Sequence, residues 1–105
     1  MESGHQSPIQ TSVRWHGVVA TVTVTGELDL TTAAGLTGRL LAVAAEHPER
    51  LVLDLSGLVF VDVAGARALD DVHTLLQTEC PVILRRPRPS ARKTFRLTGL
   101  SEDVR

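Results

Sequence analysis

The sequence predicts an α/β domain in which helices pack on a small mixed β-sheet. Segments that alternate with a period of two, and short apolar runs typical of buried strands, are interleaved with segments of helical period. The chain has 105 residues and 43% of them are apolar, which suits one domain with one modest core. These apolar residues are mostly Val, Leu and Ala, a composition expected where helices cover a buried sheet.

A β-hairpin is predicted at the start of the domain. Residues 1–11 carry Ser, Gly, Gln and Pro without a hydrophobic period, so they are expected to form a flexible tail, with the domain covering residues 12–105. Residues 12–15 are a short strand candidate, and His16-Gly17 supplies a turn. In residues 18–25, Val and Ala alternate with mostly Thr, which predicts a second strand with one apolar face.

A helix and a central strand follow the hairpin. Residues 26–32 are polar and rich in helix-capping residues, so they are expected to end the strand and start the helix. Apolar residues then recur at helical spacing up to Pro48: Ala33, Leu36, Leu40, Val43 and Ala44. Residues 51–55 are short and largely apolar, as in a strand at the centre of a sheet.

The second half of the chain again contains a helix followed by a strand, and then a last helix. A second amphipathic helix is marked by apolar residues at helical spacing: Ala68, Leu69, Val72, Leu75 and Leu76. Residues 81–84 are another buried strand, and residues 89–97 are a short helix with Pro89 in its first turn and Gly99 as its cap. Consecutive strand–helix–strand units predict parallel neighbouring strands, with the hairpin adding an antiparallel pair.

Composition and charge disfavour several classes of partner. A net charge of −1 gives no reason to expect nucleic acid or an anionic membrane as the main partner. No apolar run approaches the roughly 18 residues needed to span a bilayer, and the N-terminus lacks the features of a signal peptide. A cytoplasmic protein is therefore predicted. Cys80, the single cysteine, cannot form an internal disulfide and is expected to be a buried thiol.

Few reactive groups converge, so an enzyme is not expected. The chain lacks a phosphate-binding glycine loop, and no metal or cofactor is predicted. Asp70 and His73 are three residues apart on a predicted helix, but a solvated helix face explains them as well. Residues 85–93 concentrate five positive charges, and a solvated basic surface is preferred there over contact with phosphates or an acidic protein.

Asp62 stands where a strand-like segment passes into the second helix. As the N-cap residue, its carboxylate would accept backbone N–H bonds and stabilise the helix by about 1 kcal/mol. The same helix end could instead bind an anionic group, because its unpaired N–H groups and the helix dipole point outward. The residues themselves leave both interpretations open.

Four segments, in this order and spacing, resemble the STAS domain family and, more narrowly, bacterial anti-sigma factor antagonists. The segments are GELD at residues 26–29, LVLDLS at 51–56, FVD at 60–62 with Gly65, and the stretch 89–100. The resemblance covers about residues 12–100. It implies a mixed four- to five-stranded sheet opened by a hairpin, with helices packed on it. Similar domains usually continue into another strand and helix, which are expected to be missing here.

The resemblance also implies a partner-switching role. Such proteins bind an anti-sigma factor, often a serine kinase, and so release a sigma factor to start transcription. The kinase inactivates them by phosphorylating the Ser or Thr after the motif aspartate, which adds about −1.5 to −2 charge. In this chain Val63 and Ala64 follow Asp62, and neither accepts a phosphoryl group. The partner-binding residues that we expect are Glu27, Asp29, Asp62, Val63, Ala64, Gly65 and Arg67.

An alternative function stays open. The chain would then be a STAS scaffold or sensory module in a larger signalling or transport assembly, which needs no phosphorylation switch. The missing acceptor and the short C-terminus both favour this interpretation. A helix face left uncovered by missing C-terminal elements would also favour self-association.

Overall fold

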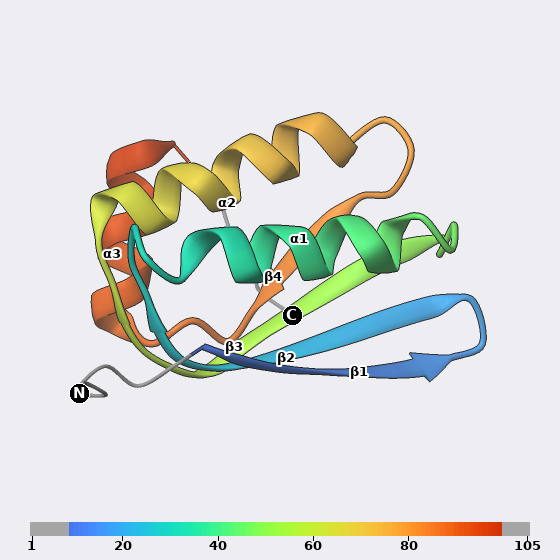
Figure 1. The fold of residues 1–105 in the computed structure, drawn as a ribbon, viewed down its shortest axis with the longest axis horizontal. Coiled ribbons are helices and arrows are strands. Elements are labelled where there is room, and N and C mark those ends of the chain that lie inside the picture. The colour runs from blue at the N-terminus through green and yellow to red at the C-terminus, as the bar shows by residue number, and fades with distance from the viewer. Residues whose placement is uncertain (1–8, 100–105) are drawn as a thin grey trace.

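The computed structural model describes residues 9–99, which form one four-stranded sheet and three helices. The elements in chain order are β1 (Gln10–His16), β2 (Val19–Leu28), α1 (Ala33–Ala44), β3 (Arg50–Val61), α2 (Val63–Leu76), β4 (Val82–Arg85) and α3 (Pro89–Thr98). The strands lie in the order β1-β2-β3-β4 (Figure 1). β1 and β2 are antiparallel, whereas β2–β3 and β3–β4 are parallel. The predicted fold class is confirmed.

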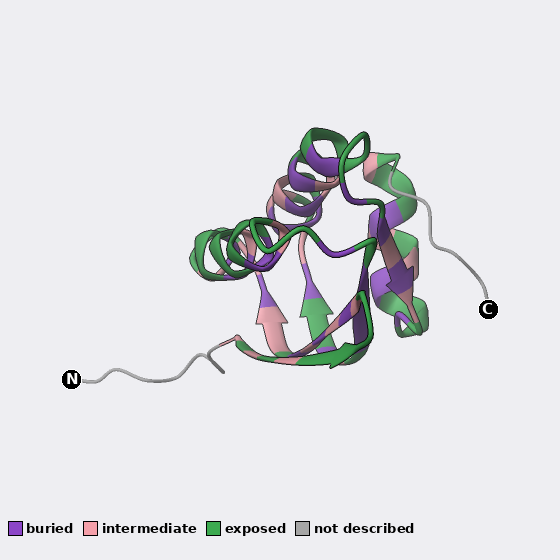
Figure 2. Cartoon of the chain, turned by 90° about the vertical axis from the view of Figure 1, so that its right-hand side faces the viewer, coloured by how far each residue is buried: buried purple, intermediate pink, exposed green. Residues whose placement is uncertain are grey.

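The helices cover one face of the sheet. α1 and α2 pack side by side over it, and α3 packs against α2 and β3 (Figures 1 and 2). Along β2, Ala20, Val22 and Val24 point to the helices and are fully buried, whereas the intervening threonines are partly or fully exposed. The alternation predicted from the sequence therefore places one face of β2 in the core, and the opposite face is not covered by any described helix.

The core lies between the sheet and the helices. In α1 the residues at helical spacing are buried as predicted, with Ala44 partly buried. Phe95 of α3 is 2% exposed and belongs to this core. Cys80 is also buried, as predicted, and this burial raises the pKa of its thiol, as does the nearby Glu79 carboxylate. Two apolar residues expected to face the core do not: Leu75 is 66% exposed on α2 and Val18 is 59% exposed at the hairpin turn.

Both central strands run further than predicted. β2 continues to Leu28 and β3 to Val61, although glycine and polar residues weaken the strand pattern in both segments. Residues 25–28 pair with residues 57–61 in parallel, with shifts in register along the way. The pairing satisfies the backbone N–H and C=O groups of both segments. Each segment satisfies its backbone hydrogen bonds only through the other, so this stabilisation cannot be predicted from either segment alone.

The first strand also starts earlier than predicted. β1 begins at Gln10, so the last two residues assigned to the tail belong to the strand, where they pair with Thr25 and Val24. This pairing is made by backbone hydrogen bonds, so the polar side chains of these residues gave no sign of it in the sequence. Of the remaining tail, residues 1–8 lie outside the described residues, and so does the position at which the expected missing strand and helix would follow. No described helix is long and apolar enough to cross a membrane.

Candidate functional site

The predicted partner-binding residues gather at one end of the sheet. Leu28 and Val61 are paired at the ends of β2 and β3, and the N–H of Asp62 donates to the carbonyl of Leu28 at 3.1 Å. This contact brings the GELD segment next to the first turn of α2, at the left of Figure 1. We call this region the α2-end surface and define it by Glu27, Asp29 and residues 62–67. Two segments more than thirty positions apart thus form a single surface.

Asp62 is the N-cap of α2. Its backbone is extended, with φ −101° and ψ 176°, and its Oδ1 accepts a hydrogen bond from the Gly65 N–H at 2.7 Å. The carbonyl of Asp62 accepts the first helical bond, from Ala66, at 2.9 Å. The capping interpretation is therefore confirmed. Because the Asp62 carboxylate itself occupies the helix end, an external anion there would meet a negative charge.

The cap leads to a prediction for stability. Replacing Asp62 with Ala should lower the free energy of unfolding by about 1 kcal/mol, because the Gly65 N–H loses its partner. Urea denaturation of the two proteins measures this difference. The matched control is Asp71→Ala, an exposed position further along the same helix, where Ala should be neutral or slightly stabilising. Equal losses in both variants would show that general charge effects, and not the cap, are responsible.

Gly65 fixes the distance between α2 and β2. A Cβ atom at this position would lie 2.7 Å from the carbonyl oxygen of Leu28 and 2.8 Å from its Cγ. Only a residue without a side chain permits this approach without a shift of the backbone. Gly65 is itself buried. Gly65 therefore allows α2 to pack closely on the end of β2, and it presents no side chain to a partner.

Asp29 organises the turn between β2 and α1. Its Oδ1 accepts hydrogen bonds from the Thr31 hydroxyl at 2.7 Å and from the backbone N–H groups of Thr31 and Thr32 at 2.9 and 3.1 Å. The hydroxyl bond from Thr31 is the main reason that the pKa of Asp29 lies below its ordinary value. The Thr32 hydroxyl in turn donates to the Glu27 carbonyl at 2.7 Å. Asp29 thus holds the GELD turn in shape.

The structure adds apolar residues to this end of the molecule. Exposed fractions are 75% for Leu30, 51% for Val59, 48% for Phe60 and 41% for Val63. Leu30 follows the GELD turn, Val59 and Phe60 lie just before Val61 at the end of β3, and Val63 is the first residue of α2. We call these four residues the apolar rim. The sequence contained a signal for it, because four consecutive apolar residues, 58–61, cannot all face the core of a strand of period two.

The other predicted residues differ in exposure. Val63 and Arg67 are exposed on the first turns of α2, and Ala64 is partly exposed. Asp70 and His73 lie further along the helix and are both partly exposed. Among the described residues, no group of three or more His, Cys, Asp or Glu side chains is arranged to hold a metal ion. The apolar rim and the carboxylates of the α2-end surface thus lie beside each other, a combination suited to contact with a protein.

Comparisons with known proteins identify relatives of this chain by sequence and by fold. Residues 10–105 match the sequence model of the STAS domain. Anti-sigma-F factor antagonist RsfB of Mycobacterium tuberculosis is 39% identical over 61 residues, which are 58% of this chain and 50% of that protein. The chain thus spans about half the length of the curated relatives that it matches.

Solved structures extend the comparison to nearly the whole described chain. The crystal structure of an anti-sigma factor antagonist from Mycobacterium paratuberculosis is 35% identical, with a TM-score of 0.77, over 87% of this chain and 78% of that one. The murine anion transporter Slc26a9 contains the same fold, with a TM-score of 0.73 at 16% identity over 89% of this chain and 18% of the transporter. The second likeness concerns the fold alone.

Proposed function

The chain belongs to the STAS domain family, and from this premise we propose that it is a cytoplasmic anti-sigma factor antagonist that acts by binding and not by catalysis. Two relatives carry that name and resemble this chain at 35% and 39% identity. The proposed partner is an anti-sigma factor of the serine kinase type, and the proposed contact is the α2-end surface with its apolar rim. Release of a sigma factor for transcription would follow from this binding.

The observation that carries the proposal is the apolar rim beside the capped start of α2. Leu30, Phe60 and Val63 expose apolar side chains to solvent beside the helix start that Asp62 caps and where Gly65 packs closely against Leu28. Apolar and aromatic residues are enriched at the centre of protein interfaces, and a preformed surface loses little entropy on binding. These exposed side chains are not needed to fill the core of the domain.

We further propose that the protein escapes inactivation by the kinase. Val63 directly follows the cap aspartate and is 41% exposed, so a side chain at this position is within reach of a partner. Valine has no hydroxyl, so no phosphoryl group can be attached to it. Binding would then persist in the presence of ATP, and the antagonist would act continuously.

Mixing the protein with an anti-sigma kinase and ATP tests this proposal. Mass spectrometry should find no phosphate at position 63, and calorimetry should find the complex unchanged by ATP. The matched variant Val63→Ser restores a hydroxyl, so it should become phosphorylated and lose its partner when ATP is added. Phosphate elsewhere on the unaltered chain, accompanied by loss of binding, would contradict the proposal.

A scaffold or sensory module in a larger signalling or transport assembly is the second candidate. Val63 favours it as well, because such a role needs no phosphoryl acceptor. The same experiment separates the two functions. Failure to bind any serine kinase anti-sigma factor, together with co-purification of a partner that is not a kinase, would favour the scaffold. Self-association through an uncovered helix face stays a prediction.

A further inference from the structure

The face of the sheet opposite α1 and α2 carries a shallow trough. Two hollows of about 320 and 380 Å³ share His16, Thr21 and Arg85 in their walls and so adjoin each other. Their ionisable lining residues come from β1, β3, β4 and the residue after β4, whereas β2 contributes Val19, Thr21 and Thr23. We call the ionisable residues the basic trough, and they are Arg14, His16, Arg50, Asp54, Arg85 and Arg86. These residues are far apart in the sequence, and only the sheet brings them together.

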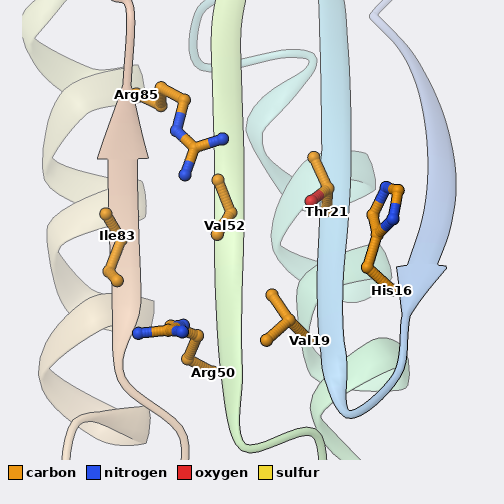
Figure 3. Close-up of a pocket in the computed structure, with 7 residues that line it drawn as sticks. All are labelled: His16, Val19, Thr21, Arg50, Val52, Ile83 and Arg85. Atoms are coloured by element: carbon orange, nitrogen blue, oxygen red, sulfur yellow. The ribbon is translucent and has the colours of Figure 1, made fainter. Parts of the chain in front are cut away.

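Strand register explains the shape of the trough. Thr21 of β2, Val52 of β3 and Ile83 of β4 are consecutive partners across the sheet, so they form one row on the uncovered face. In Figure 3 the side chains of Arg50 and Arg85 extend on either side of Val52 and Ile83. Two guanidinium groups therefore flank an aliphatic floor.

The trough is strongly positive. Four arginines line it, and among the described lining residues Asp54 carries the one negative charge. Asp54 is already paired, since its Oδ2 accepts a hydrogen bond from Arg86 at 2.7 Å. Burial raises the pKa of Asp54, but hydrogen bonds from Ser56 and Arg86 outweigh this effect and leave the pKa below its ordinary value. The remaining arginines of the trough are thus available to a ligand, in a chain whose net charge is −1.

The spread of the charges indicates the kind of ligand. Arg14 and Arg85 lie on the two edge strands, three strand spacings or about 14 Å apart. The arginines are spread over two adjoining hollows, so a ligand that fills both should carry several negative charges along its length. The described lining residues include no Phe, Tyr or Trp on which nucleobases could stack. Carboxylates separated by aliphatic side chains match both the arginines and the floor.

We propose that the basic trough is a second binding surface, which takes an acidic segment of a protein with aliphatic residues between its carboxylates. The trough covers the first halves of β2 and β3, whereas the α2-end surface lies at their last residues and on α2. Both surfaces can therefore be occupied at once, and the domain can link two partners. This inference does not depend on the identity of the partner at the α2-end surface.

A labelled peptide in which Glu alternates with Leu is the probe. Fluorescence anisotropy measures its dissociation constant with the purified protein, which should rise with ionic strength because the contacts are charged. The double variant Arg50→Glu and Arg85→Glu should bind at least about tenfold more weakly, since two attractive pairs become repulsive. The matched control, Arg39→Glu and Lys93→Glu, changes the same net charge at exposed positions outside the trough. It should stay within about twofold of the unaltered protein.

Amide chemical shifts of the unaltered protein provide a second measurement that needs no variant. Addition of the peptide should shift signals of residues such as Thr21, Val52 and Ile83 and leave Val63 unchanged. Equal loss of affinity in both double variants would overturn the proposal, because attraction would then be nonspecific. Tighter binding of a single-stranded oligonucleotide would overturn it too, and so would shift changes confined to other faces. Circular dichroism checks that each variant keeps its fold.

Discussion

Replacing Val63 with Glu is expected to weaken binding to the anti-sigma factor at least about 100-fold, which corresponds to about 2.7 kcal/mol. Val63 is the first residue of α2 and belongs to the apolar rim. A carboxylate buried there on binding would lose its hydration without a partner, at a cost of several kcal/mol. The fold should tolerate the change, because the N-terminus of a helix favours negative charge. Isothermal titration calorimetry measures the loss.

Two controls separate the causes of this effect. Leu75→Glu introduces the same charge in place of an apolar residue on the same helix, at a position that is 66% exposed and far from the rim. Its affinity should stay within about twofold of the unaltered protein. Val63→Gln keeps the size of Glu without the charge, so it should lose less affinity than Val63→Glu. If Val63→Glu binds normally, the first turn of α2 is not part of the interface.

Replacing Gly65 with Ala is expected to lower the free energy of unfolding by about 2 kcal/mol. The new Cβ atom would stand 2.7 Å from the backbone oxygen of Leu28, and a backbone atom cannot move aside as the end of a flexible side chain can. Either α2 or the end of β2 must shift, and the hydrogen bond from the Asp62 N–H to Leu28 would then be strained. Urea denaturation measures the change in stability.

Gly38→Ala is the matched control and should have the opposite sign. Gly38 lies in α1, is exposed, and has no atom within 4 Å of an added Cβ. Alanine there should stabilise the protein by about 0.5–1 kcal/mol, because glycine lowers helix stability. The same substitution in two helices thus tests packing separately from helix propensity. A neutral or stabilising Gly65→Ala would mean that α2 does not approach β2 this closely.

The basic run at residues 85–93 shows how the fold redistributes a sequence feature. The sequence predicts one solvated basic surface there. In the structure, Arg85 and Arg86 line the trough, whereas Arg88 donates to the Ser56 carbonyl at 3.1 Å and Lys93 lies on α3. Arg86 follows β4 in a left-handed backbone conformation, with φ 57°, and its guanidinium pairs with Asp54. Consecutive charges therefore serve different parts of the molecule.

Local information in the sequence was enough for the element types and for the chemistry of position 63. The period of two in β2, the helical spacing in α1 and the capping chemistry of Asp62 depend on neighbouring residues, so they could be predicted correctly. The absence of a hydroxyl at Val63 is likewise a property of the residue itself. The sequence is therefore sufficient to predict that the protein escapes phosphorylation at this position.

Tertiary structure alone decided how far the strands run, which residues of the run 58–61 are exposed and which charges become neighbours. The last residues of β2 and β3 are strands because they pair with each other, although Gly26 and Glu27 in β2 and Ser56 and Gly57 in β3 interrupt the strand pattern. Val59 and Phe60 are both exposed because the register shifts between the pairs Gly26–Leu58 and Glu27–Phe60, which leaves Val59 as an extra residue and interrupts the alternation of faces. Arg14, Arg50 and Arg85 become neighbours through strand order. Strand pairing and charge clustering are relations between distant residues, so periodicity along the chain does not determine them.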